Sequence, residues 1–165
     1  MKKLFSILVL AVALITSAAA QQTGTSVNMT SLDSSLTQAH VANTAAVTMF
    51  TKVSNAWDVA SIQLIETKVS GTIGGTAILV GSNDGVNFVN ICRPSVAASS
   101  LQLRTTDSLT STDVTTNTKI WVLSNKSDAM GNPSVCVPYQ YIGIKKTGTG
   151  TMNSTIKAVA VFKHK

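Results

Sequence analysis

The sequence is poor in the residue types that build most enzyme centres and metal sites. It has two histidines, His40 and His164, two cysteines, Cys92 and Cys136, and only 12% charged residues. The histidines lie far apart and no closely spaced cysteine pair occurs, so the usual zinc patterns are missing. No Gly-x-Ser-x-Gly elbow occurs, and residues 71–75 (GTIGG) lack the lysine and helix of a phosphate-binding loop. We therefore expect a non-enzymatic protein with no catalytic residue, no metal and no cofactor.

The seven acidic residues do not single out a catalytic pair. A glycosidase needs two carboxylates facing each other across a cleft, and the spacing of these acids along the chain selects no pair. Asp84 is explained by a turn. Asp107 and Asp113 fall in a polar segment, residues 105–118, which we interpret as a loop or a mobile hairpin. Their spacing matches no calcium-binding loop, so we expect them to be solvated loop acids.

Positive charge exceeds negative charge, with a formal net charge of +6. Lys2 and Lys3 belong to the N-terminal segment, which leaves +4. No basic run with interleaved aromatic residues occurs, so we expect no nucleic-acid partner. Much of the remaining positive charge lies near the C-terminus, where we expect a solvated basic rim: Lys145, Lys146, Lys157, Lys163 and Lys165.

The N-terminus has the three-part pattern of a secretory signal peptide. A short basic start is followed by an apolar stretch, residues 4–16, and by small residues up to Ala20. The apolar stretch, about thirteen residues, is shorter than the roughly twenty that a membrane-spanning helix needs. We therefore predict a signal helix over residues 1–20, cleaved between Ala20 and Gln21, with a retained anchor as the alternative. The Ala-Gln-Gln junction resembles leaders common in Bacteroidetes. Export would take the chain to the periplasm, the cell surface or the medium, so that it meets a membrane only through its leader.

An exported chain enters an oxidising space, where its two cysteines can pair. Cys92 and Cys136 each lie in or beside a predicted strand, so a bridge between neighbouring strands is geometrically reasonable. Such a bridge would stabilise the fold by about 3 to 4 kcal/mol on a chain-entropy basis. Two unrelated buried thiols are the alternative.

Residues 21–44 are rich in Ser, Thr, Gln and Asn, with scattered apolar residues. We interpret this segment as a polar N-terminal arm, either extended or forming a loosely packed first strand. In a symmetric assembly such an arm could add to the sheet edge of a neighbouring subunit.

Residues 45–165 are predicted to form one all-β domain. Gly85 follows Asn83 and Asp84 in a sequence typical of a hairpin turn. Apolar and polar residues alternate along residues 151–163, as in a strand with one buried face. Six segments give strand signals: residues 45–53, 57–91 (two or three strands), 101–104, 119–123, 139–145 and 151–163. Short strands with no convincing helix after the leader predict an antiparallel β-sandwich, with a jelly roll as one candidate topology.

The few large aromatic residues allow two interpretations. Trp57, Trp121, Tyr139 and Tyr141 could form a flat platform on which sugars stack. With so few such residues, packing in the core is the interpretation we favour for each.

Part of the sequence resembles a known group of proteins. Residues 69–88 (VSGTIGGTAILVGSNDGVNF), 141–144 (YIGI) and 148–152 (GTGTM) look like small β-sandwich proteins encoded in the structural regions of bacteriophages and prophages, including virion decoration, fibre and tail-associated proteins. The resemblance extends over residues 45–163. It describes a hairpin and a final strand pair, so it carries over no functional residue. The secretory leader departs from ordinary phage capsid proteins. A leader would fit a virion protein that crosses the host membrane, or a surface protein that a bacterium has kept.

These observations predict an exported structural or assembly subunit, either of a phage-type virion (capsid, decoration or fibre) or of an extracellular surface. Its expected partners are copies of itself or other structural subunits. The alternative is a secreted module that binds a glycan or a cell surface. An assembly subunit should form a defined oligomer, whereas a binding module should stay monomeric.

Overall fold

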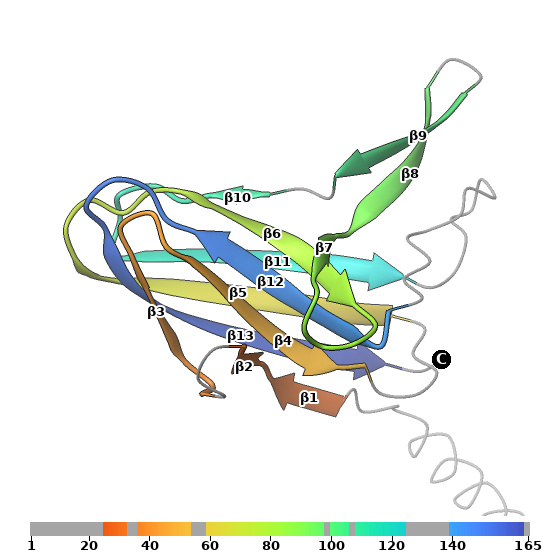
Figure 1. The fold of residues 1–165 in the computed structure, drawn as a ribbon, viewed down its shortest axis with the longest axis horizontal. Coiled ribbons are helices and arrows are strands. Elements are labelled where there is room, and N and C mark those ends of the chain that lie inside the picture. The colour runs from red at the N-terminus through yellow and green to blue at the C-terminus, as the bar shows by residue number, and fades with distance from the viewer. Residues whose placement is uncertain are drawn as a thin grey trace, which may run out of the picture.

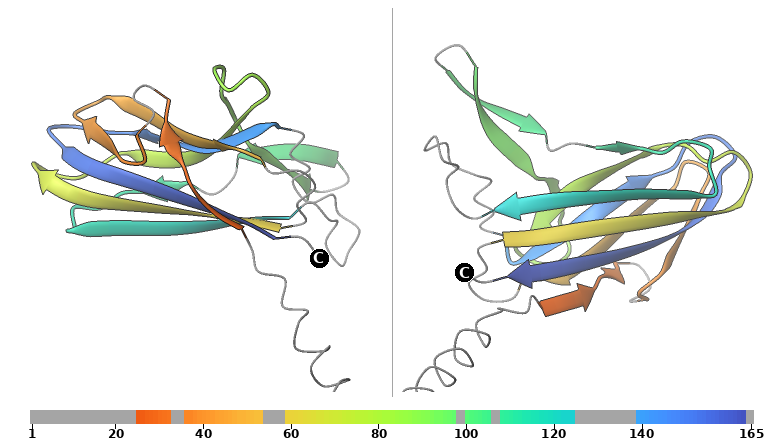
Figure 2. Two further views of the ribbon diagram at one scale, coloured as in Figure 1. Left: turned by 90° about the horizontal axis from the view of Figure 1, so that it is seen from below. Right: turned by 180° about the vertical axis from the view of Figure 1, so that it is seen from behind.

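The computed structural model describes residues 25–32, 36–53, 59–97, 100–105, 108–124 and 139–163. Within these ranges every regular element is a strand, and the strands form two large antiparallel sheets and one small ribbon (Figure 1). The two large sheets lie face to face as layers (Figure 2). The predicted all-β antiparallel sandwich is therefore confirmed.

The first sheet, which we call sheet A, has five strands. Its main path runs β1 (Thr25–Asn28), β13 (Asn153–Lys163), β5 (Val59–Ser70) and β11 (Thr116–Ser124), and β3 (Ala39–Ala42) also pairs with β13. β5 and β13 pair along their whole lengths, with a register irregularity at the start of β13. These two long strands form the centre of sheet A.

The second sheet, sheet B, has six strands. Its path runs β10 (Leu109–Thr110), β6 (Thr76–Ser82), β12 (Tyr141–Thr147), β4 (Ala46–Lys52) and β2 (Thr30–Ser31). β12 lies at the centre, because it pairs with both β4 and β6 over seven residues each.

Three short strands complete the fold. β7 (Val89–Asn90) pairs with β6, while β8 (Cys92–Ala97) and β9 (Ser100–Thr105) pair only with each other among the described strands.

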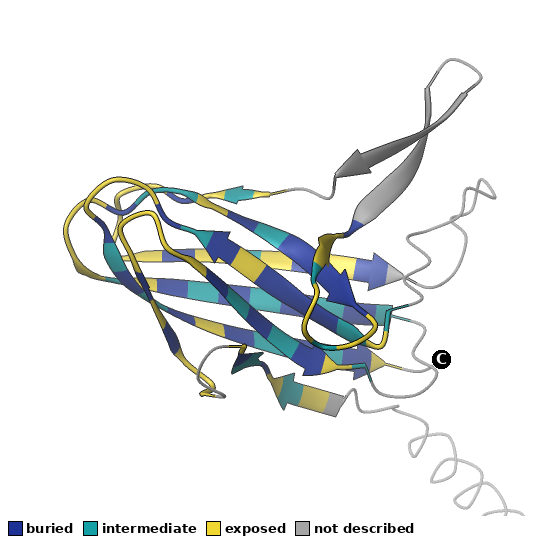
Figure 3. Ribbon diagram, viewed as in Figure 1, coloured by how far each residue is buried: buried dark blue, intermediate teal, exposed yellow. Residues whose placement is uncertain are grey.

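Alternation along the strands places the core between the sheets (Figure 3). In β13 the even-numbered residues from Ser154 to Phe162 are buried, and odd-numbered residues such as Lys157 face outward. The predicted faces of this strand are confirmed. The core includes residues from both sheets: Met29, Val41, Met49, Ile62, Leu64, Leu79, Trp121, Leu123, Ile142, Ile144, Ile156 and Phe162.

The segment predicted to be an N-terminal arm contributes to both sheets. β1 and β3 pair with β13, and β2 pairs with β4. Met29 and Val41 are completely buried. Because apolar residues alternate with polar ones here, the segment can bury one face despite its polar composition. Among the described residues the strands of the sandwich thus begin at Thr25, within the segment 21–44 that we expected to be an extended arm or a loosely packed first strand.

Part of the polar segment 105–118, which we expected to be a loop or a mobile hairpin, forms strands. It contains β10 and the first residues of β11, which begins at Thr116 and extends beyond the predicted strand 119–123 at both ends.

No helix long and apolar enough to cross a membrane occurs in the part of the chain that the structure describes.

Candidate functional site: a buried Glu–Lys–Ser cluster and two outer faces

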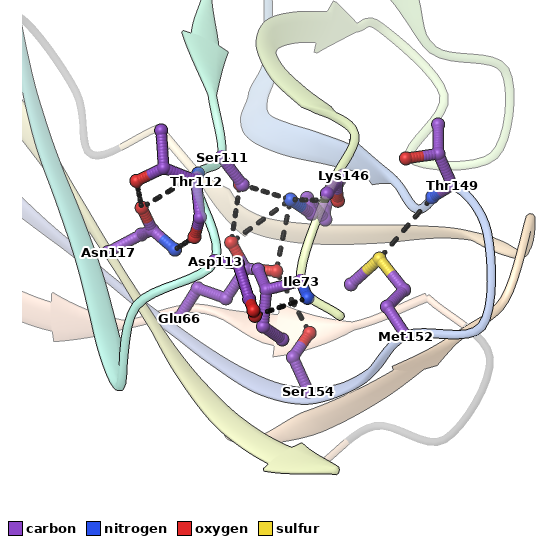
Figure 4. Close-up of polar contacts among 11 residues, drawn as sticks. Glu66, Ile73, Ser111, Thr112, Asp113, Asn117, Lys146, Thr149, Met152 and Ser154 are labelled. Carbon is purple, nitrogen blue, oxygen red and sulfur yellow. Dashed lines mark hydrogen bonds and ion pairs between the residues drawn. The ribbon is translucent and has the colours of Figure 1, made fainter. Parts of the chain in front are cut away.

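A cluster of four polar side chains connects the two sheets (Figure 4). Glu66 on β5 and Ser154 on β13 come from sheet A. Lys146 on β12 and Ser111, directly after β10, come from the side of sheet B. Glu66, Lys146 and Ser154 are completely buried, and Ser111 is 6% exposed. We call these four residues the buried cluster.

Strand alternation places the two charged residues inside. Glu66 follows Ile62 and Leu64 at every second position of β5, and all three side chains are completely buried. Lys146 follows Ile142 and Ile144 in the same way on β12. Each charge therefore occupies the end of an apolar row, where the pleat directs it toward the opposite sheet.

The cluster is fully hydrogen-bonded. Lys146 Nζ lies 3.0 Å from each carboxylate oxygen of Glu66 and also donates to the Gly74 carbonyl oxygen at 3.2 Å. A further short hydrogen bond joins Lys146 Nζ to Ser111 Oγ. The Ser111 hydroxyl donates to Glu66 Oε2 at 2.5 Å, and the Ser154 hydroxyl donates to Oε1 at 2.9 Å. Because every donor of the ammonium has an acceptor, the buried charges are compensated.

Burial shapes the electrostatics of this pair. Burial lowers the pKa of Lys146, while the hydrogen bond and the charge of Glu66 oppose that change. Taking two ions out of water costs several kcal/mol each, so such a pair persists only when attraction and hydrogen bonds offset that cost. The arrangement can therefore hold the two sheets together in one register, and it brings an amine and a carboxyl group together without water.

The expectation that Lys146 belongs to a solvated basic rim is wrong. The same expectation of solvent exposure is correct for Lys145, Lys157 and Lys163. The two-residue spacing of Lys146 from Ile144 and Ile142 indicates that Lys146 lies on the buried face of the strand. This indication is easily missed, because a lysine in a strand normally faces water.

The predicted loop acid Asp113 lies next to the buried cluster but faces solvent. Its Oδ1 accepts hydrogen bonds from Lys68 Nζ at 2.7 Å and from the Ile73 backbone N–H at 2.9 Å. These contacts, that of Lys68 first, lower the pKa of Asp113. Asp113 thus ties the loop after β5 to the loop before β11. Asp107 lies outside the described residues.

The predicted turn residues connect β6 to β7. Asp84 Oδ1 accepts from the Ser82 hydroxyl at 2.7 Å and from the backbone N–H groups of Val86 and Asn87 at 2.9 and 2.8 Å. These bonds hold the pKa of Asp84 well below its ordinary range. Gly85 adopts φ = 75°, a conformation that side chains resist. The third turn residue, Asn83, accepts from the backbone N–H of Gln140 through its Oδ1 at 3.2 Å.

Two of the four large aromatic residues, Trp121 and Tyr139, follow the favoured interpretation of packing in the core. Trp121 is buried in the core, and Tyr139 packs against the core, while Trp57 lies outside the described residues. Tyr141 forms part of a different group, because its ring centroid lies 5.9 Å from that of Phe50, which in turn lies 5.3 Å from that of Phe88. All three rings are partly exposed on the outer side of sheet B. We call Phe50, Phe88 and Tyr141 the aromatic group.

The outer side of sheet A carries an aliphatic patch. Ile120 and Val122 on β11 are 56% and 55% exposed. The register pairs Ile120 and Val122 with Gln63 and Ser61 of β5, and these two polar residues pair in turn with the half-buried Val159 and Val161 of β13. Ile120, Val122, Val159, Val161 and the half-buried Ile65 of β5 thus surround Gln63 and Ser61, and we call these five apolar residues the aliphatic face. Alternation along β11 places Ile120 and Val122 on the same side of the sheet.

The other predicted site residues lie mostly beyond the described ranges. Cys136, Ala20 and Gln21 fall outside them, and Cys92 begins β8. Among the described residues, no three His, Cys, Asp or Glu side chains come together in a way that could hold a metal ion.

Comparisons with known proteins find similarity of fold. No family model and no curated protein matches the chain. Three solved structures illustrate the similarity. A structure of infectious bursal disease virus, Gx strain, is 11% identical, with a TM-score of 0.43, and the match covers 86% of this chain and 33% of that one. The CBM22-1 xylan-binding domain from Paenibacillus barcinonensis Xyn10C is 9% identical, with a TM-score of 0.39, over 88% of this chain and 99% of that one. The enzymatically active domain of tailspike protein 4 from bacteriophage CBA120 is 11% identical, with a TM-score of 0.41, over 86% and 18%. The chain thus spans about a third of the viral protein that it matches.

Proposed function

We propose that this protein is an exported, non-enzymatic structural subunit that assembles through its sheet faces, as a component of a phage-type virion or of an extracellular surface structure. The observation that carries the proposal is the aliphatic face. Two large side chains on neighbouring outward positions of one strand, Ile120 and Val122, are each more than half exposed. Clustered apolar surface of this kind is typical of protein–protein contact sites.

The composition of the same face favours a protein partner. Threonines at Thr116 and Thr118 continue the outward row of β11 beyond the aliphatic residues. Apolar residues with a polar border, which on β13 includes the exposed Lys157 and Lys163, resemble the core and rim of a subunit interface. The buried cluster suits such a role, because it makes the sandwich a rigid unit that can be stacked.

A second function has its own supporting observation, the aromatic group on sheet B. Partly exposed rings of Phe50, Phe88 and Tyr141, close to the polar turn with Asp84 and Asn87, offer flat surfaces of the kind on which sugars stack. This favours a glycan-binding or surface-binding module. Similar solved structures include viral proteins and a xylan-binding domain, so they do not distinguish the two functions.

The first test is peptide mass spectrometry on density-banded particles and filaments from the source culture. We expect this chain in the particles or filaments in high copy number, with an N-terminal peptide beginning at Gln21. A chain absent from every particle and free in the medium would contradict the proposal and favour the binding module.

A pair of variants separates the two functions. Tyr141→Ala should leave assembly unchanged and abolish glycan binding if the second function is correct. Ile120→Thr combined with Val122→Thr should prevent assembly if the first is correct.

A further inference from the structure

The buried cluster holds the amine of Lys146 in direct contact with the carboxyl group of Glu66. Lys146 Nζ is 3.0 Å from both oxygens of Glu66, so the carboxyl carbon Cδ between them is the adjacent atom. Reacting atoms about 3 to 3.5 Å apart and held in place react as if at very high concentration. Complete burial of both side chains also keeps water away from them.

We propose that Lys146 and Glu66 become joined by an intramolecular amide bond between Nζ and Cδ, which covalently links β12 of sheet B to β5 of sheet A. The modification needs no other reagent, because an ammonium and a carboxylate already hold the atoms of one amide and one water molecule.

Ser111 supplies a path for the protons. Its Oγ accepts a hydrogen bond from Lys146 Nζ and donates one to Glu66 Oε2. A proton from the ammonium can therefore pass to Ser111 while the Ser111 proton passes to Oε2, which leaves a neutral amine and a carboxylic acid. Burial, which lowers the pKa of Lys146, favours this neutral form.

The bond-forming step then balances without an external group. The lone pair of Nζ attacks Cδ, and the π electrons of the C=Oε1 double bond move onto Oε1, which stays bonded to Cδ and to which the Ser154 hydroxyl donates. Donors placed at a developing oxyanion lower the barrier to such a step. When the carbonyl re-forms, the C–Oε2 bond breaks, and Oε2 leaves as water with a second amine proton that has passed through Ser111. Two buried charges disappear, and with them the cost of keeping ions out of water.

Tryptic peptide mapping of the folded protein after reduction of its cysteines tests the proposal directly. Cleavage after Lys52 and Lys68 releases residues 53–68, which contain Glu66. An acylated Lys146 resists trypsin, so its peptide is residues 146–157. We expect one branched peptide that joins these two, lighter than their sum by one water. Unlinked 53–68 recovered in full yield, together with cleavage after Lys146, would overturn the proposal.

Control samples test whether the link forms only in the folded protein and only at Lys146. A chain kept in denaturant from synthesis onward should lack the branched peptide, because the link requires the folded arrangement. Lys145→Arg, a change at the exposed neighbour, should keep the link, and Lys146→Arg should lose it. Ser111→Ala retains both reacting groups, so its link should form at least tenfold more slowly after refolding. Formation at the wild-type rate would refute the proton path.

This inference concerns one subunit and does not rest on the proposed function. A chain that carries the amide but stays monomeric would support the amide proposal and contradict the proposed assembly. A chain that assembles without the amide would support the assembly and contradict the amide proposal.

Discussion

Removing the charge of Lys146 should destabilise the sandwich far more than changing its neighbour on the same strand. In Lys146→Met the side chain keeps its length and apolar stem, while Glu66 keeps its buried position. Two hydroxyl donors, Ser111 and Ser154, would remain to the carboxylate. Lys145→Met is the matched control, because Lys145 points outward to solvent.

The size of the effect follows from the geometry. At 3.0 Å, with an effective dielectric constant of about 20, the attraction between the two charges is on the order of 5 kcal/mol. Without this attraction the Glu66 carboxylate stays buried, and two hydrogen bonds offset only part of its desolvation cost. We therefore expect a loss of about 3 to 5 kcal/mol, the range for breaking a buried ion pair. Lys145→Met should stay within about 0.5 kcal/mol of the wild type.

Urea unfolding followed by circular dichroism measures this difference. With a slope of about 1.5 kcal/mol per molar urea, the midpoint for Lys146→Met should fall by about 2 to 3 M. If the wild type carries the amide link, its stability is higher still and the loss is a lower bound. A loss below about 1 kcal/mol, or one equal to that of Lys145→Met, would refute the reasoning.

Three further changes test other parts of the fold. Gly85→Val should cost about 1 to 2 kcal/mol in thermal unfolding, because φ = 75° is strained for a β-branched residue, and unchanged melting would refute the turn. Phe162→Ala should cost about 3 to 5 kcal/mol by opening a cavity, and a loss no larger than that of the outward Val161→Ala would contradict the assigned face. The folded-state pKa of Asp113 lies below its ordinary value of 3.8, so the contact with Lys68 stabilises the fold above that pH and is lost as the pH falls through the folded-state pKa. Asp113→Asn should therefore lower the melting temperature at neutral pH, with a difference that shrinks in acid; a constant difference would count against the ion pair.

Much of the fold follows from local pattern. The alternation in residues 151–163 predicts β13 and its buried face, because a two-residue period can be read from one strand alone. The same period was present in residues 25–42, but polar composition obscured it. Their strands β1, β2 and β3 gain their stability from pairing with distant residues.

The buried cluster could not be predicted from the sequence. Glu66 and Lys146 are 80 residues apart and meet only when two sheets face each other. Ser111 is one of many serines, and nothing next to it in the sequence marks it as a partner of Lys146. Composition instead assigned Lys146 to the surface, the usual place for a lysine.

The central claim, that this chain assembles through the aliphatic face, is tested most directly by sedimentation velocity of residues 21–165 over a range of concentrations. We predict an oligomer of defined size that becomes monomeric when Ile120 and Val122 are both changed to Thr. The control Val86→Thr, at a residue 66% exposed in the turn after β6, should assemble like the wild type. A wild-type chain that stays monomeric at every concentration, or a double variant that assembles unchanged, would contradict the claim.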